Sequence, residues 1–181
     1  MHRLLPWIAP IVFTCAAGAT DPTGNLPDRL RPPPADELAL ATAIEWAQTA
    51  LATCKASGFD VTATYMNTYR DIKVVLRADG ARGSSAETGR RKAYTVIVTG
   101  MSSGEYGASM GYPPGSPLPQ VLGKPIALPP DVTDENLIVA EGGLPLKNAA
   151  GKIIGAVSIS GGAKDRVCAQ AGIDKIAPLL K

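Results

Sequence analysis

A loop rich in glycine and serine is the first stretch of this sequence whose residue types could bind a charged ligand. It lies within VVLRADGARGSSAETGRRKAYT (74–95), between an apolar strand and a basic helix. A Walker-type phosphate loop needs a lysine and then Ser or Thr directly after its last glycine. Here Ser84 follows Gly83, and Lys92 lies two helical turns further on. The spacing argues against a nucleoside triphosphate site, although the start of a helix can attract other anions.

The carboxylates of this stretch have simpler roles than catalysis. Ser84 and Glu87 have the S-x-x-E spacing of a capping box, in which the hydroxyl and the carboxylate bind free amides of the first helical turn. Asp79 and Glu87 lack a third group that would orient water for hydrolysis, so we interpret them as a turn residue and a cap. The sequence therefore predicts no catalytic residue.

Histidine chemistry is excluded by the position of the single histidine, His2. Residues 1–19 have a basic start, an apolar stretch over 4–13 and small residues up to Ala19, which is the pattern of a secretory signal peptide. Its removal takes His2 with it, which rules out Ser-His, Cys-His and zinc–histidine sites. We expect a periplasmic or extracellular protein with no transmembrane segment after signal cleavage.

Two of the three cysteines remain after that cleavage. Cys15 falls in the signal peptide, where the residues before it fit a lipidation signal poorly, and Cys54 and Cys168 follow later. An even pair in an oxidising compartment favours a disulfide. The alternative is two buried, reduced thiols that act as small apolar groups. A Cys-x-x-Cys redox motif is absent from the sequence.

Length and charge favour one domain without nucleic-acid partners. The chain has 181 residues and a formal net charge of +2. Nucleic-acid binding needs a clustered basic face, and this balance provides no electrostatic case for it. The basic run over 90–92 is explained more simply as the solvated face of a helix.

Apolar periodicity predicts the elements that must position these residues. Residues 20–35 are a proline-rich tether, and the domain covers 36–181. The first half contains a helix over 37–57 that ends at Gly58, strands over 60–67 and 72–77 joined as a hairpin, a helix over 85–100, and a short helix over 105–110 that begins at Ser102 or Ser103.

The second half opens with a proline-rich excursion over 111–130, a candidate lid or oligomer contact. Strands are expected at 137–140, 144–147 and 152–160, followed by a final helix over 165–180 that bends or breaks at Gly172. This order predicts the α+β class, with an antiparallel sheet between helical layers.

Six motifs, in register across Leu38 to Leu180, give the chain a family resemblance. They are the first helix with Gly58 at its end, RADGA (77–81), GRRKAYT (89–95), GGLP (142–145), GKIIGAVSISGG (151–162) and D-x-x-CAQAG (165–172). Together they resemble the GlcG/HbpS family of haem-binding proteins, which includes the C-terminal domain of PduO-type proteins. The resemblance implies a profilin-like α/β sandwich, with a central antiparallel sheet flanked by helices. It also implies a homo-oligomer and a haem or related tetrapyrrole ligand.

The chain departs from the family pattern at two places. Asn67 and Arg70 stand where members often have an aspartate and a turn glycine, and Ser84 occupies a usual histidine position. A haem site here must therefore use Tyr, Met, Cys, Lys or a hydroxyl, or bind without strong axial ligation.

The candidate cofactor-binding residues are phenols and cations. Tyrosinate can ligate haem iron, and arginine forks suit propionates. Tyr65 is expected in the core by alternation, whereas Tyr69 beside Arg70 is the best exposed phenol. The candidates are Tyr69, Arg77, Arg90, Arg91, Lys92 and Tyr94, each with an ordinary turn or solvated-face role as its alternative.

The resemblance favours a secreted binding or sensing module over an enzyme. The alternatives are a haem-degrading enzyme or one acting on a small organic acid, and a ligand-free structural or partner module. In the family's fold the first and last helices lie against the same sheet, so the resemblance also implies a Cys54–Cys168 disulfide if both thiols face the seam between those helices.

Overall fold

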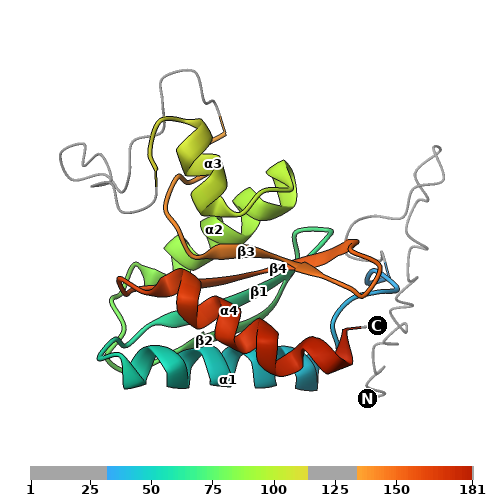
Figure 1. The fold of residues 1–181 in the computed structure, drawn as a ribbon, viewed down its shortest axis with the longest axis horizontal. Coiled ribbons are helices and arrows are strands. Elements are labelled where there is room, and N and C mark those ends of the chain that lie inside the picture. The colour runs from blue at the N-terminus through green and yellow to red at the C-terminus, as the bar shows by residue number, and fades with distance from the viewer. Residues whose placement is uncertain (1–31, 114–133, 181) are drawn as a thin grey trace, which may run out of the picture. The chain divides into compact units, whose positions relative to one another are not determined.

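The computed structural model describes residues 32–113 and 134–180. The predicted signal peptide, most of the tether and most of the proline-rich excursion lie outside these residues. The described residues form four α-helices and one antiparallel sheet, arranged as Figure 1 shows, so the predicted α+β class is confirmed. The helices are α1 (Leu40–Ala56), α2 (Ser85–Thr99), α3 (Ser103–Ser109) and α4 (Asp165–Ile176), with a 3-10 turn η2 (Ala177–Leu179). The strands are β1 (Thr62–Asn67), β2 (Ile72–Arg77), β3 (Gly143–Lys147) and β4 (Ile153–Ser160).

The sheet has the order β2-β1-β4-β3, with every neighbouring pair antiparallel. The central pair aligns Thr64 with Ser158 and Tyr65 with Val157. Helices α1 and α4 pack against each other and cover one face, while α2 covers the other face (Figure 1). Strands β2 and β3 therefore form the two edges of the sheet.

Side-chain alternation gives the two faces different chemistry. On the α1/α4 side, Ala63 and Tyr65 join a large apolar cluster. On the α2 side, the Oγ1 atom of Thr62 lies 2.7 Å from the Ser85 Oγ atom, and Ser158 donates to the backbone oxygen of Gly89 at 2.7 Å. The α2 side of the sheet thus combines these polar contacts with a small apolar cluster that includes Met66 and Val96. A Cβ atom at Gly89 would lie 2.9 Å from the Thr64 Oγ1 atom, so glycine is needed there for the helix to lie this close.

Helices α1 and α4 are joined covalently. Cys54 and Cys168 form a disulfide, with Cα atoms 5.5 Å apart and no exposed side-chain surface on either residue. The predicted break at Gly172 is wrong, because α4 continues through it. A Cβ atom at Gly172 would lie 2.6 Å from the Trp46 Cδ1 atom, so glycine is needed there for close helix packing.

Two further local predictions are wrong. Residues 137–140 are not a strand, because their backbone bonds to α2: the Ile138 amide donates to the Thr95 Oγ1 atom at 2.9 Å. Ser84 does not cap α2, because its own backbone is helical and Glu87 instead pairs with Arg90.

A capping box is present at α3, where Ser102 and Glu105 bind each other's backbone amides. The first helix begins at Leu40 rather than 37, since Glu37 and Leu38 bond to the sheet instead.

Candidate functional site

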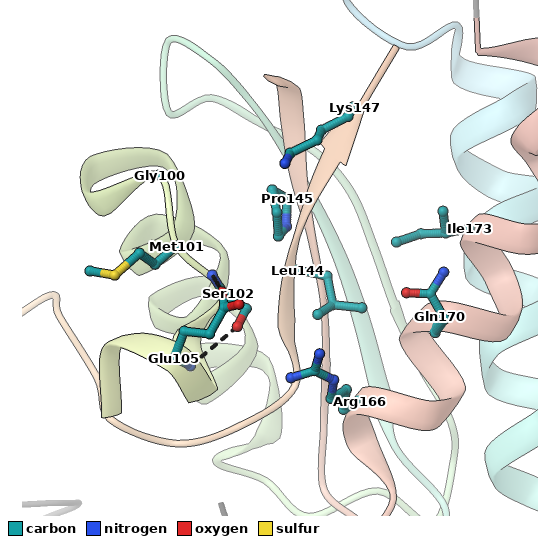
Figure 2. Close-up of a pocket in the computed structure, with 10 residues that line it drawn as sticks. All are labelled: Gly100, Met101, Ser102, Glu105, Leu144, Pro145, Lys147, Arg166, Gln170 and Ile173. Carbon is teal, nitrogen blue, oxygen red and sulfur yellow. Dashed lines mark hydrogen bonds between the residues drawn. The ribbon is translucent and has the colours of Figure 1, made fainter. Parts of the chain in front are cut away.

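The candidate site is an open groove of about 730 Å³ that wraps the free edge of β3, between α3 and α4 (Figure 2). Its volume lies within the usual range for small-molecule sites. The lining residues come from three separate parts of the chain: Gly100, Met101, Ser102, Glu105, Leu144, Pro145, Lys147, Arg166, Gln170 and Ile173.

The floor of the groove is an edge strand that cannot accept another strand well. The Ile159 amide donates to the Gly142 oxygen, so by antiparallel alternation the backbone of Gly143 and Pro145 faces away from β4. The Gly143 amide is already bound to the Ser103 Oγ atom at 2.9 Å, and proline has no N–H to donate. This edge therefore offers carbonyl acceptors and apolar side chains in place of a full hydrogen-bonding ladder.

One face of helix α4 forms one wall of the groove. Arg166, Gln170 and Ile173 recur at four- and three-residue steps of α4 and line the groove together. The opposite wall is the junction of α2 and α3. Gly100 ends α2 with a φ of 72°, which turns the chain so that Met101 and the α3 capping box reach the groove.

Three charged side chains belong to the groove lining. Lys147 and Arg166 are cationic, whereas Glu105 is anionic. Hydrogen bonds from Ser102 lower the pKa of Glu105, and the positive charges of Arg166 and Lys147 act in the same direction. The groove lining therefore combines apolar and polar surface, and its two cations are offset by Glu105 and by Glu141 beside Arg166.

This arrangement suits binding of an amphipathic anion. Pro145, Ile173 and Met101 provide apolar contact, with Leu144 largely buried behind them, and the two cations are placed to meet acidic groups. Within residues 32–113 and 134–180, no three side chains of His, Cys, Asp or Glu are grouped so that they could hold a metal ion. None of the helices in the described part of the chain has the length and apolar character that crossing a bilayer requires.

Three of the sequence-predicted residues hold a neighbouring segment. Arg91 donates to the Leu137 oxygen, and Tyr94 donates to the Asp134 carboxylate at 2.8 Å. Arg90, on α2, binds Glu87 through two nitrogen atoms and also donates to the Asn136 side chain at 2.8 Å. Burial lowers the pKa of Arg91. These side chains therefore fasten residues 134–137 to α2.

Lys92 lies neither on a solvated helix face nor at the surface where it could meet a ligand. Its side chain is buried, and its Nζ atom donates to the Asp165 carboxylate at 2.7 Å and to the Ile159 oxygen at 2.9 Å. Burial lowers the pKa of Lys92, while Asp165 acts in the opposite direction. Lys92 thus joins α2, β4 and the first turn of α4, so the expectation that it lies on a solvated helix face is wrong.

The last two candidates lie apart from the groove. Tyr69 is 42% exposed in the β1–β2 turn, where its amide donates to the Asn67 side chain. Arg77 ends β2 and donates to the Ala81 oxygen. None of the six predicted binding residues lines the groove. Sequence reasoning missed Lys147 and Arg166, which follow the GGLP motif and lie within D-x-x-CAQAG.

Comparison with solved structures identifies the fold. The Klebsiella pneumoniae protein ORFY matches with a TM-score of 0.62 and 24% identity, over 76% of this chain and 88% of that chain. A double mutant of Streptomyces reticuli HbpS matches with a TM-score of 0.62 and 20% identity, over 94% and 99%. The PduOC–haem complex matches with a TM-score of 0.59 and 21% identity, over 76% and 94%.

Comparison with curated protein sequences found no significant match. A family model described as "Haem degrading protein HbpS-like" matches residues 38–174. This match covers most of the chain and agrees with the resemblance carried by the six motifs. The chain belongs to the HbpS-like family.

Proposed function

We propose that this protein binds haem or a related anionic tetrapyrrole in the groove along β3. The observation that carries the proposal is that apolar side chains, Met101, Pro145 and Ile173, line the same groove as Lys147 and Arg166. The family description names haem, and the PduOC neighbour was solved as a haem complex. A tetrapyrrole with propionates has both the apolar surface and the negative charges that such a groove accommodates.

The residues that line the groove fit the tetrapyrrole better than they fit its iron. Met101 supplies a thioether, which is a soft but weak donor, and the groove has no histidine, cysteine or tyrosine in its lining. Apolar contact and charge would therefore hold the ligand, with Met101, Pro145 and Ile173 against it. When bound, the iron would supply redox chemistry.

A hemin titration tests this proposal. Hemin is added to the full chain while the Soret band is recorded, and we expect a shifted band that saturates. Met101→Glu should weaken binding because it places a charge in the apolar wall, whereas Val98→Glu is a matched control at an exposed α2 position outside the groove lining. An unshifted, free-hemin spectrum at stoichiometric protein would overturn the proposal and favour a partner module without a ligand.

Haem degradation is the second candidate, and the family description is the observation in its favour. The haem complex is incubated with ascorbate and the Soret absorbance followed. Degradation predicts faster bleaching with the unmodified protein than with the Met101→Glu variant. Equal rates would leave binding as the function.

Export and self-association complete the proposal. The pattern of residues 1–19 supports export to the periplasm or outside the cell, and a disulfide is typical of oxidising compartments. Cell fractionation tests export: recovery of the uncleaved chain in the cytoplasm would contradict it.

Self-association is supported by the family resemblance and by Ile72 and Val75, which are 44% and 43% exposed on β2. Light scattering across micromolar concentrations should give a mass above that of one chain. A mass of a single chain throughout would contradict a homo-oligomer.

A further inference from the structure

We propose that the groove along β3 is selective for apolar molecules with two anionic groups. In this proposal Lys147 and Arg166 bind those anionic groups. The negative charge of Glu105 repels the same groups and so lowers the affinity of the groove for the ligand. The inference deepens the proposed tetrapyrrole function, because it assigns the chemistry by which the same groove chooses its ligand. Its charge argument applies to any apolar dianion.

Arg166 is held loosely enough to bind an incoming anion. Its side chain is 48% exposed, and its Nη1 atom lies 3.8 Å from the Glu141 carboxylate, which is longer than a hydrogen bond. Exposed pairs of this kind contribute little to stability, so exchanging Glu141 for a ligand carboxylate costs little. The planar guanidinium can bind a carboxylate or sulfonate through two nitrogen atoms.

Lys147 provides the second positive charge. It ends β3, is exposed and forms no ion pair with any residue of the described chain. Figure 2 shows the side chains of Lys147 and Arg166 reaching toward the groove from its two ends, with Leu144 and Pro145 between them. A ligand that lies along β3 therefore meets one cation at each end.

Glu105 opposes the two cations from the α3 wall. One of its oxygen atoms accepts from the Ser102 amide at 2.8 Å, which fixes the carboxylate beside the groove. Its pKa is lowered, so it stays ionised near neutral pH. Glu141, 3.8 Å from Arg166, is a second carboxylate beside the groove, so the two cations and two carboxylates balance. An anionic group is therefore attracted by its direct contact with Lys147 or Arg166, and a neutral molecule gains nothing from that contact.

The backbone of β3 argues against a peptide as the occupant. A strand added at this edge needs N–H donors from β3, but the Gly143 amide is bound to Ser103 and Pro145 has none. A small molecule bound through side chains does not need those donors.

The test uses two fluorescent probes with the full chain. Bis-ANS is an apolar disulfonate, and ANS is its counterpart with one sulfonate. We expect Arg166→Gln and Lys147→Gln each to weaken bis-ANS binding by about threefold to fivefold, and to weaken ANS binding less. Glu105→Gln keeps an oxygen for the Ser102 amide and should tighten bis-ANS binding by about threefold. Lys175→Gln removes a charge from the same helix outside the groove and should change neither.

Hemin serves as the third probe and separates the two proposals. If hemin binds but the Arg166 and Lys147 variants bind both bis-ANS and hemin as the unmodified chain does, the charge selectivity is wrong and tetrapyrrole binding stands. If hemin does not bind but bis-ANS shows the expected pattern, the tetrapyrrole function is wrong and the dianion site stands. The inference is overturned if Glu105→Gln binds the probes with the same affinity as the unmodified chain. It is also overturned if Glu105→Gln and the control Lys175→Gln change the affinity by the same amount.

Discussion

Lys92 carries a positive charge into the interior, where its side chain is 3% exposed and that of its partner Asp165 is 9% exposed. The carboxylate also accepts from the Gly162 amide at 2.9 Å. Helix α2, strand β4, the turn at Gly162 and helix α4 therefore meet at one ion pair. If either partner is removed, the other charge stays buried without an opposite charge beside it, which is strongly destabilising.

We predict that Lys92→Met lowers the free energy of unfolding by about 3 to 5 kcal/mol. The double variant Lys92→Met with Asp165→Asn should lose less, because it removes both charges and keeps an acceptor for the Gly162 amide. Urea denaturation followed by circular dichroism measures both. A double variant that is less stable than the single one would contradict this account.

Arg70 is a second residue of interest, because its backbone conformation is unfavourable. Its φ of 71° lies in the left-handed region, which disfavours residues with a Cβ atom, and the family resemblance places a turn glycine there. Arg70→Gly should therefore be more stable than Arg70→Ala by about 1 kcal/mol. Both variants lose the same charge, so their difference in urea midpoint isolates the backbone. Equal midpoints would show that the turn relaxes without strain.

At the scale of elements, the disulfide holds α4 against α1 on the face of the sheet. The cysteines are 114 residues apart in sequence, so in the chain-entropy model the cross-link restricts the unfolded chain strongly. On the native side, the Trp46 indole donates to the Ala169 oxygen at 3.2 Å beside the bond. The position of Arg166 in the groove thus depends on a helix that the bond anchors.

We predict no free thiol when the chain without residues 1–19 is titrated in denaturant without reductant, and two free thiols would show that no Cys54–Cys168 bond forms. Replacing Cys54 and Cys168 by Ala should lower the free energy of unfolding by about 2 to 4 kcal/mol. An unchanged midpoint in urea for the Ala variant would show that the bond does not constrain the unfolded state.

The elements that the sequence predicted well are those with strong periodicity. Strand β2 was predicted with its observed bounds, and β1, α2 and β4 within about two residues. Residues 137–140 misled the prediction, because an apolar segment that bonds to a helix has the same composition as a strand. Gly172 misled it because a glycine that permits helix contact looks like one that ends a helix.

The groove was not predictable in the same way. Its lining joins the α2–α3 junction, β3 and one face of α4, and only the sheet order β2-β1-β4-β3 brings these together. Residues 90–92 were candidate ligand contacts because their positive charges are consecutive in sequence. Lys147 and Arg166 are separate in sequence and form a pair only in the folded chain.

For the whole molecule, Tyr65 links stability to pH. Its side chain has no exposed surface, its oxygen accepts from the Leu38 amide at 3.0 Å, and burial raises its pKa to about 12. The unfolded chain loses this proton near its ordinary pKa of about 10. The folded state therefore holds more protons between these values, and stability falls as pH rises through them.

We predict that the unfolding free energy declines between about pH 10 and 12 by up to about 2 to 3 kcal/mol from this group. Tyr65→Phe should remove that part of the decline, at a cost of about 1 kcal/mol near neutral pH for the lost hydrogen bond. Urea titrations at a series of pH values measure both effects. Parallel pH profiles for the two proteins would show that Tyr65 does not carry the linkage.

The edge of β3 also bears on how this chain behaves in a crowded solution. Exposed sheet edges are templates for aggregation, because each free amide and carbonyl can recruit a strand of another molecule. Pro145 and the Ser103–Gly143 bond withhold the donors that such growth requires. The features that keep β3 available to a small molecule thereby also stop it from starting a fibril.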